Sequence, residues 1–183
     1  MQYTIIGIFE SNSLLSIIVL HLSNSSLYSF TTYLSSLPLR LKSVPIRNWM
    51  EIETTMNYLS ASTNLVGVQA EPIKQALAAD VLEEIQHAQA LARRIHILGG
   101  SVPGSMDFSA VQKSMQPNSE ATDVVAVIKG VIDNEEAAIA QYKKTIKLCE
   151  DDPVTEDICV TLLADEEEHL RLFQGYLYEF ENR

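Results

Sequence analysis

The sequence predicts an all-α fold: a four-helix bundle of two helical hairpins joined by a long crossover, preceded by an irregular N-terminal extension. Two observations lead to this prediction. The first is that the motif Glu-x-x-His occurs twice, each time after a glutamate and a tyrosine that are seven residues apart. The eight residues are Glu51, Tyr58, Glu84 and His87 in the first half, and Glu135, Tyr142, Glu166 and His169 in the second. Such a duplication indicates two hairpins related by a pseudo-twofold axis.

The second observation is that apolar residues surround both motifs at helical spacing. They are Leu77, Val81, Ala88 and Leu91 around Glu84, and Leu162, Leu163, Leu170 and Phe173 around Glu166. Residues three apart lie on one face of a helix, so the glutamate and the histidine of each motif can bind one ion. A carboxylate within an apolar stripe is costly unless it is protonated, paired or bound to a cation. Two such carboxylates indicate a shared metal site in the bundle core.

Composition limits the function further. A chain of 183 residues fits one domain with a sizeable core. Its formal net charge of -11 argues against direct nucleic-acid binding, which depends on clustered Lys and Arg. The two cysteines, Cys149 and Cys159, form no Cys-x-x-Cys, which excludes a rubredoxin-type or zinc-ribbon site. This cysteine usage is typical of a reducing compartment, so we expect a cytoplasmic protein.

Residues 1–44 differ from the rest of the chain and are expected to form an atypical extension, followed by the bundle domain over residues 45–183. Their only charges are Glu10, Arg40 and Lys42, and their apolar runs are shorter than the roughly 20 residues of a membrane span. A signal peptide is disfavoured because a basic start is missing and Glu10 interrupts the apolar core. The alternative is a reading-frame or start-site artefact joined to a normal domain, in which case the extension is not native.

The first hairpin is expected to begin near Pro45, because proline is tolerated only in the first turn of a helix. Its first helix extends to about Gly67. Pro72 opens the second helix, which ends at Leu98 before a glycine pair that supplies a left-handed cap. Residues 101–119, rich in Pro, Gly, Ser and Asn, are long enough to cross the length of a bundle.

The second hairpin is expected to begin at about Glu120, with Ser119 as the N-cap of a helix that extends to about Glu150. The stripe of this helix is Val124, Ile128, Val131, Glu135, Ala138, Ile139, Tyr142 and Ile146. Glu136 is adjacent to Glu135, but the spacing to Tyr142 favours Glu135 as the ligand. Asp152 and Pro153 begin the last helix, which continues to about Glu181, and no fifth helix follows.

Taken together, these residues resemble the ferritin-like superfamily, in particular bacterioferritin and the Dps-like cages that have a bacterioferritin-type site. The resemblance covers roughly residues 46–181. It is strongest over residues 50–58, 84–100, 135–142 and 163–169. A single Glu-x-x-His is common by chance, whereas two copies, each preceded by Glu-x6-Tyr, are a specific signal.

The resemblance implies a site for two iron ions per subunit, with manganese as an alternative. The implied ligands are Glu51, Glu84, His87, Glu135, Glu166 and His169, with Glu84 and Glu166 bridging the ions. Glu83 and Asp165 would each hydrogen-bond the histidine of the other hairpin. Tyr58 and Tyr142 would lie beside the site as hydrogen-bond donors or one-electron reductants. Haem is not expected, because Ile85 occupies the position of the haem-ligating methionine in bacterioferritin.

The function implied is a ferroxidase that oxidises Fe(II) with O2 or H2O2 for iron storage and detoxification inside a homo-oligomeric cage. The lack of a fifth helix favours a 12-mer over a 24-mer. The alternative is a stand-alone di-iron or di-manganese oxidoreductase, such as a rubrerythrin-like peroxidase or a manganese catalase-like enzyme, that does not store iron. A structural bundle without metal would require the whole ligand set to be coincidental. Cys149 and Cys159 have two interpretations, packing at a helix junction or a redox role.

Overall fold

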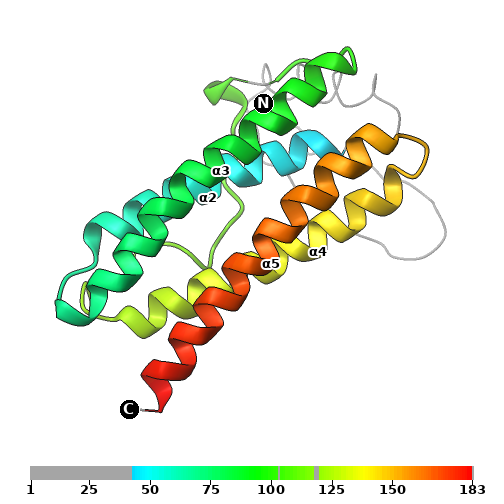
Figure 1. Ribbon diagram of the computed structural model, residues 1–183. Coiled ribbons are helices and arrows are strands. Elements are labelled where there is room, and N and C mark those ends of the chain that lie inside the picture. The colour runs from blue at the N-terminus through cyan, green and yellow to red at the C-terminus, as the bar shows by residue number, and fades with distance from the viewer. Residues whose placement is uncertain (1–42, 103, 118–119, 183) are drawn as a thin grey trace, which may run out of the picture.

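The computed structural model describes residues 43–182, except 103, 118 and 119, so nearly all of the expected extension lies outside the described residues. The described chain forms an all-helical four-helix bundle (Figure 1). Its long helices are α2 (Ser43–Asn64), α3 (Glu71–Ile97), α4 (Val124–Leu148) and α5 (Pro153–Glu181). Two short 3-10 turns accompany them, η2 (Val68–Ala70) and η3 (Ser105–Asp107). None of the described helices is both long enough and apolar enough to cross a membrane.

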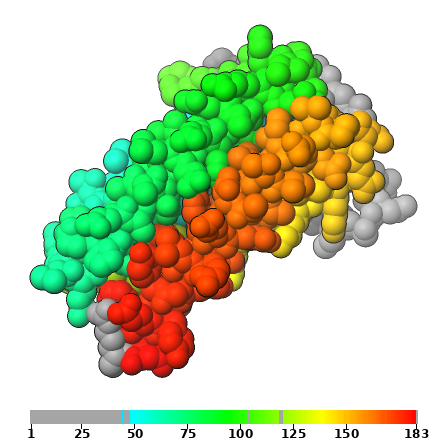
Figure 2. All heavy atoms as spheres, viewed as in Figure 1, coloured from blue at the N-terminus to red at the C-terminus, as the bar shows by residue number. Residues whose placement is uncertain are grey.

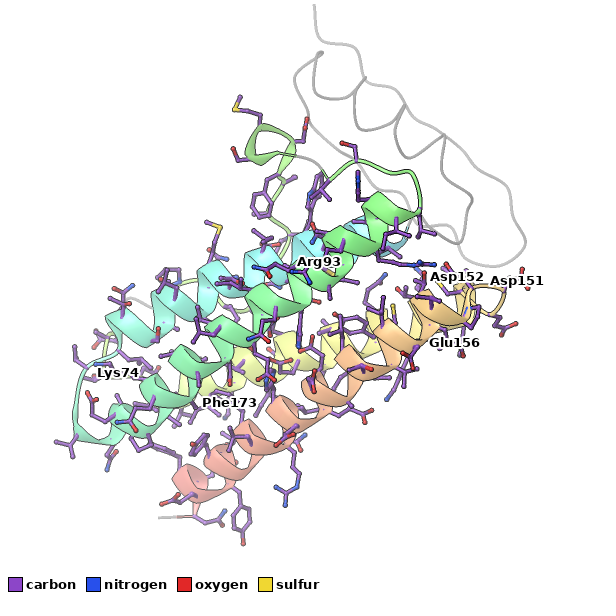
Figure 3. All side chains as sticks on the ribbon, turned by 45° about the horizontal axis from the view of Figure 1, so that its top comes forward. Lys74, Arg93, Asp151, Asp152, Glu156 and Phe173 are labelled. Atoms are coloured by element: carbon purple, nitrogen blue, oxygen red, sulfur yellow. The ribbon has the colours of Figure 1, made fainter. Side chains whose placement is uncertain are left out.

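The helices pair as two hairpins, α2 with α3 and α4 with α5, whose turns lie at opposite ends of the bundle (Figure 1). Figure 3 labels Lys74 near the first turn and Asp152 at the second. Between the hairpins, α2 faces α4 and α3 faces α5. Figure 2 shows α3, in green, beside α5, in orange to red, on one face of the molecule. Every helix therefore contributes a face to the common interior.

Four helix boundaries differ from those expected from the sequence. Helix α2 begins at Ser43 rather than near Pro45, and the proline is accommodated because it still lies in the first turn. The same helix ends at Asn64 rather than Gly67, because the N–H of Val66 leaves the helical ladder and donates to the carbonyl of Ala121 at 2.9 Å.

The other two differences are at the start and the end of α4. This helix begins at Val124, four residues later than expected, and its N-cap is Asp123, whose side chain accepts the N–H of Ala126 at 3.0 Å. The expected N-cap, Ser119, lies outside the described residues. The helix ends at Leu148, two residues before Glu150, with Cys149 as its C-cap.

The other boundaries follow local sequence signals. Helix α3 begins at Glu71 with Pro72 in its first turn, and beyond its end Gly99 adopts a φ of 79°, as a left-handed cap requires. Helix α5 begins at Pro153, where the carboxylate of Asp152 accepts the N–H of Thr155 at 3.2 Å. Both helices start with a proline, α5 also has an aspartate N-cap, and a glycine follows α3, so these boundaries could be predicted from the sequence.

The buried core consists of two apolar clusters, one toward each end of the bundle. One contains Tyr58, Leu65, Ala70, Ile73, Leu77, Met115, Val124, Ile128, Val131 and Phe173. The other contains Val44, Leu91, Ile95, Tyr142, Cys159 and Leu162. Each cluster includes one tyrosine of the repeated Glu-x6-Tyr motif, and buried acidic and histidine side chains lie in the helix segments between the clusters.

The crossover between the hairpins is attached to α2 by buried polar groups. Glu53 is 4% exposed and accepts the backbone N–H groups of Val111 and Gln112 at 2.7 to 2.9 Å. The side chain of Gln112 donates to Thr54 at 2.7 Å and accepts from Asn57 at 2.9 Å. These bonds satisfy backbone N–H groups of a segment that has no ladder of its own.

Candidate metal centre

The bundle brings the six proposed ligands together at its middle. Helices α2 and α4 contribute one glutamate each, and α3 and α5 each contribute a glutamate and a histidine from one helical face. All six side chains are buried, with exposures of 0 to 5%: Glu51, Glu84, His87, Glu135, Glu166 and His169. Burial of four carboxylates in one place requires protons or cations to offset their charge.

The ligand atoms form two overlapping groups, and in each group they lie within 4.8 Å of one another. The first group is Glu51, Glu84, His87 and Glu166, and the second is Glu84, Glu135, Glu166 and His169. Glu84 and Glu166 belong to both groups. Two adjacent cation positions with two shared carboxylates are therefore compatible with this arrangement.

The histidines turn their Nδ1 atoms toward these carboxylates. His87 Nδ1 lies 3.7 Å from Glu84 and 3.6 Å from Glu166, and His169 Nδ1 lies 3.7 to 3.9 Å from Glu84, Glu135 and Glu166. Both Nδ1 atoms, and Oε2 of Glu135, are buried and make no hydrogen bond within the described part of the chain. These separations exceed a hydrogen bond but suit atoms that bind the same ion, so the donor set fits a cation.

The opposite nitrogen of each ring contacts an acid from the other hairpin. Nε2 of His87 lies 3.2 Å from Asp165, and Nε2 of His169 lies 3.2 Å from Glu83. When the ring is neutral, an Nε2–H that donates to a carboxylate leaves the electron pair of Nδ1 facing the centre, where it can bind a cation. Each acid therefore lies where it can orient the histidine ring of the other hairpin.

The two tyrosines make the same kind of contact between hairpins. The fully buried hydroxyl of Tyr58 donates to Glu135, and that of Tyr142 donates to Glu51 at 2.5 Å. Burial and the nearby carboxylates, above all Glu135, raise the pKa of Tyr58 well above its usual value. The phenol is therefore neutral and remains a hydrogen-bond donor at physiological pH.

Burial and the surrounding charges shift three pKa values at the centre, those of His87, Glu135 and His169. Burial lowers the pKa of His87, but Glu166, Glu51 and Asp165 outweigh that effect and raise it. Burial raises the pKa of Glu135 well above its usual value, and the carboxylates of Glu166 and Glu84 raise it further. Burial lowers the pKa of His169, but Glu166, Glu135 and Asp80 outweigh that effect and raise it to about 10. Without a cation, the centre therefore retains protons at neutral pH.

Asp80 is a buried acid that the sequence analysis did not single out. Its carboxylate lies 3.8 Å from Nε2 of His169, and burial raises its pKa to about 6. Asp80 precedes Glu84 by four residues, one helical turn, so it interrupts the same apolar stripe. That interruption was the signal by which the sequence could have identified Asp80 as a candidate site residue. Cys159, by contrast, lies inside an apolar cluster, as the packing interpretation of the cysteines expects.

A family model described as a ferritin-like domain matches residues 49–182. The chain therefore belongs to the ferritin-like family, and its buried glutamate and histidine cluster is consistent with a two-metal site. Among individual proteins, the DNA protection during starvation protein of Pyrococcus furiosus is 27% identical over 135 residues, which are 69% of this chain and 70% of that protein.

Solved structures share the fold at low sequence identity. The bacterioferritin-related protein of Bacteroides fragilis, described as a dodecameric thioferritin, gives a TM-score of 0.69 at 21% identity, over 84% of this chain and 94% of that one. The bacterioferritin of Desulfovibrio desulfuricans, which has a diiron site, gives 0.67 at 20% identity, over 78% and 80% of the two chains. These similarities show that the chain shares the four-helix architecture of both proteins.

Proposed function

We propose that the protein is a ferroxidase that binds two Fe(II) ions as substrate, oxidises them with O2 or H2O2, and retains the product in a protein cage. The observation that carries the proposal is the membership of Glu84 and Glu166 in both ligand groups. Four glutamate carboxylates also offset the charge of two dications. A pair of ions thus relieves the electrostatic cost of burying these acids, which a single ion would relieve only in part.

The chemistry needs the two ions side by side. Each Fe(II) loses one electron, so the pair reduces one O2 to H2O2, or one H2O2 to two water molecules, and either reaction consumes two protons. Glu51 and Glu135 each serve one ion, and the tyrosine hydroxyl on each of these acids fixes its position. Glu83 and Asp165 fix the histidines. Manganese suits the same donors and is the alternative metal.

The test is an anaerobic Fe(II) titration of the metal-free protein, followed by oxidant. We expect two Fe(II) per chain at the buried site, and rapid oxidation when O2 or H2O2 is added. Glu84→Gln should lose binding of both ions because both ligand groups contain Glu84. Glu136→Gln, an exposed neighbour of Glu135, is the matched control and should behave as wild type. Binding of one ion or none by the wild type would refute the proposal.

The cage is the second part of the proposal. It is supported by the B. fragilis relative, which is described as dodecameric, and we propose a homo-oligomer of 12 subunits in the cytoplasm. We also propose that the cage holds no haem, since Ile85 occupies the position of the haem ligand. The P. furiosus relative is named for DNA protection, but the net charge of -11 opposes direct binding to DNA.

The alternative function is a di-iron or di-manganese oxidoreductase without storage. It is favoured by a groove of about 460 Å3 that contacts His87 between α3 and α5 and could admit a small substrate. The same titration separates the two functions when light scattering is added. Iron uptake well beyond two per chain in a large assembly supports storage, whereas saturation at two in a monomer or dimer supports the oxidoreductase.

A further inference from the structure

The pseudo-twofold repeat is broken at a polar contact between α2 and α4. When the Glu-x6-Tyr motifs of the two helices are aligned, Thr54 is paired with Ala138 and Asn134 with Met50. Thr54 and Asn134 are each 3% exposed, and the amide of Asn134 donates to the hydroxyl of Thr54 at 3.3 Å. The side chains of Ala138 and Met50 cannot form the equivalent bond. One of the two related contacts is therefore polar, which is costly in a buried place unless its groups are hydrogen-bonded.

The crossover between the hairpins completes this contact. The side-chain amide of Gln112 donates to Thr54 at 2.7 Å and to the carbonyl of Met50 at 3.3 Å, and its oxygen accepts from Asn57 at 2.9 Å. The carboxylate of Glu53 accepts the backbone N–H of Gln112 at 2.7 Å, which fixes the segment at this point of α2. Because one crossover joins the two hairpins (Figure 1), one of the two related contacts receives such a residue and the other does not. The asymmetry therefore follows from the topology.

These three residues, Thr54, Gln112 and Asn134, form a crossover cluster that adjoins a ligand on each helix. Thr54 follows Glu51 by three residues, which is about one turn of α2. Asn134 directly precedes Glu135 on α4. The bond between Thr54 and Asn134 therefore joins the turn that carries one glutamate to the turn that carries the other.

The spacing of α2 and α4 determines how far apart two ions would lie. Glu51 belongs only to the first ligand group and Glu135 only to the second, whereas Glu84 and Glu166 belong to both. A shift of α2 against α4 would move the two unshared glutamates relative to each other while the shared pair stayed in place. A displacement of about 1 Å can slow a reaction by about a hundredfold, so a contact that holds this spacing matters to the chemistry.

We propose that Thr54, Gln112 and Asn134 are positioning residues of the metal centre, through which the crossover fixes the distance between α2 and α4 and hence the distance between the two ions. They act through Glu51 and Glu135 and bind no ion themselves. The inference rests on the proposed function, because it assumes that two ions occupy the centre.

The test uses the full-length protein, loaded with Mn(II) without oxygen. The electron paramagnetic resonance spectrum of bound Mn(II) reports the interaction between neighbouring ions, which weakens steeply as they separate. Thr54→Val keeps the shape of the side chain and removes the hydroxyl, and Gln112→Met removes the amide at a half-buried position. We expect both variants to bind two Mn(II) per chain, with an affinity lower by about tenfold and an altered interaction between the ions.

Two further variants are controls. Thr54→Ser keeps the hydroxyl and should retain the spectrum and the affinity of the wild type. Thr145→Val makes the matched substitution at another buried threonine, whose hydroxyl donates to the carbonyl of Gln141 on its own helix at 3.0 Å. It should change neither property. Circular dichroism and light scattering confirm that each variant is folded and assembled.

A second readout is the rate of Fe(II) oxidation by O2 when the sites are saturated with Fe(II). Both electrons must reach the same oxidant, so a changed distance between the ions should slow this step by about tenfold or more in Thr54→Val. Saturation separates this effect from the weaker binding. Thr54→Ser should restore the rate.

Each outcome decides between the two proposals. A wild-type spectrum in Thr54→Val or Gln112→Met, even with lower stability, overturns the positioning role and leaves the ferroxidase proposal intact. The same conclusion follows if Thr54→Ser or Thr145→Val alters the spectrum as much as Thr54→Val does, because the effect would then not depend on this hydroxyl. If Thr54→Val does not fold, Gln112→Met decides alone. Fewer than two ions in the wild type overturn both proposals.

Discussion

At the scale of single residues, the hydrogen bonds to Glu51, Glu135 and the two histidines come from the opposite hairpin. Tyr58 on α2 bonds Glu135 on α4, and Tyr142 on α4 bonds Glu51 on α2. In the same way, Asp165 on α5 contacts His87 on α3, and Glu83 on α3 contacts His169 on α5. The ligands therefore take their positions only when the hairpins have docked. Metal binding and hairpin packing should stabilise each other.

The first prediction concerns protons at the centre. His169 has a pKa raised to about 10, so at pH 7 it carries a proton on each nitrogen in the metal-free protein. A cation at Nδ1 must displace one of them. We expect proton release on Mn(II) binding and an affinity that rises by about tenfold per pH unit for each proton released, up to pH about 10. Calorimetry in buffers of different ionisation enthalpy measures the release.

The control for this experiment is His96→Gln. His96 is an exposed histidine on the same helix as His87, so its loss should change neither the proton count nor the affinity. Mn(II) binding with no proton release at pH 7 would contradict the charge state assigned to His169.

At the scale of elements, the contacts that hold the bundle in register involve segments outside the helix stripes. The crossover lies against α4 at Gly130, where a Cβ atom would be 2.6 Å from the carbonyl oxygen of Ser114. At the α4–α5 turn, Arg94 from the end of α3 binds Asp152 at 2.6 and 2.9 Å and Thr155 at 2.8 Å. One contact positions the start of the second hairpin, and the other ties its turn to the first.

Gly130→Ala should destabilise the protein. Helix propensity alone would favour alanine by about 0.5–1 kcal/mol, but the clash is with backbone that cannot rotate away, and overpacking typically costs about 1–3 kcal/mol. Gly175→Ala on α5 meets no atom within 4 Å and should stabilise by about 0.5–1 kcal/mol. Urea unfolding of both variants measures the difference. Equal stabilisation by the two alanines would show that the crossover does not pack on Gly130.

Asp152→Asn should remove a pH-dependent contribution while it keeps an N-cap. Burial raises the pKa of Asp152, but hydrogen bonds from Arg94 and Thr155 lower it more, to about 2. A carboxyl with a lowered pKa in the folded state stabilises above its unfolded pKa of about 4, and that stability is lost as pH falls toward 2. We expect the variant to lose about 1–2 kcal/mol at pH 7, after allowance for solvent screening.

The measurement is the free energy of unfolding of the wild type and Asp152→Asn as a function of pH. The difference between them should be constant above pH 5 and should shrink between pH 4 and pH 2. A difference that does not depend on pH would mean that the asparagine acts through geometry rather than charge.

At the scale of the whole molecule, the core consists of two apolar clusters with an acidic centre between them. The apolar clusters favour folding, whereas four buried glutamates without cations oppose it. Metal ions should therefore act as part of the core, and the stability of the bundle should depend on them.

Mn(II) should raise the melting temperature of the metal-free protein by about 10–20 °C, because ligand at 100 times its Kd contributes about 2.7 kcal/mol at each of the two sites. A chelator should reverse the shift. Glu84→Gln should abolish most of the shift and melt no lower than the wild type without metal, because it removes one buried charge. Scanning calorimetry measures both effects. A Glu84→Gln variant that still gains the full shift would place the stabilising ions elsewhere.

The sequence by itself determined the helical segments and the ligand pairs within them. Glu84 with His87, and Glu166 with His169, are neighbours because a helix brings residues three apart to one face, which no other part of the chain can alter. The proline starts of α3 and α5, and the glycine beyond α3, are local signals of the same kind. The duplicated spacing then implied that four helices share one interior.

Only the tertiary structure decided what depends on contacts between distant segments. The end of α2 moved because Val66 pairs with Ala121, fifty-five residues further along the chain. The contact of Asp80 with His169 on another helix could be seen only in the fold. Within its own helix, Asp80 is simply an acid among apolar neighbours. Hydrogen bonds and charges act through space over a few ångströms, so a residue's partners are set by the fold rather than by its position in the sequence.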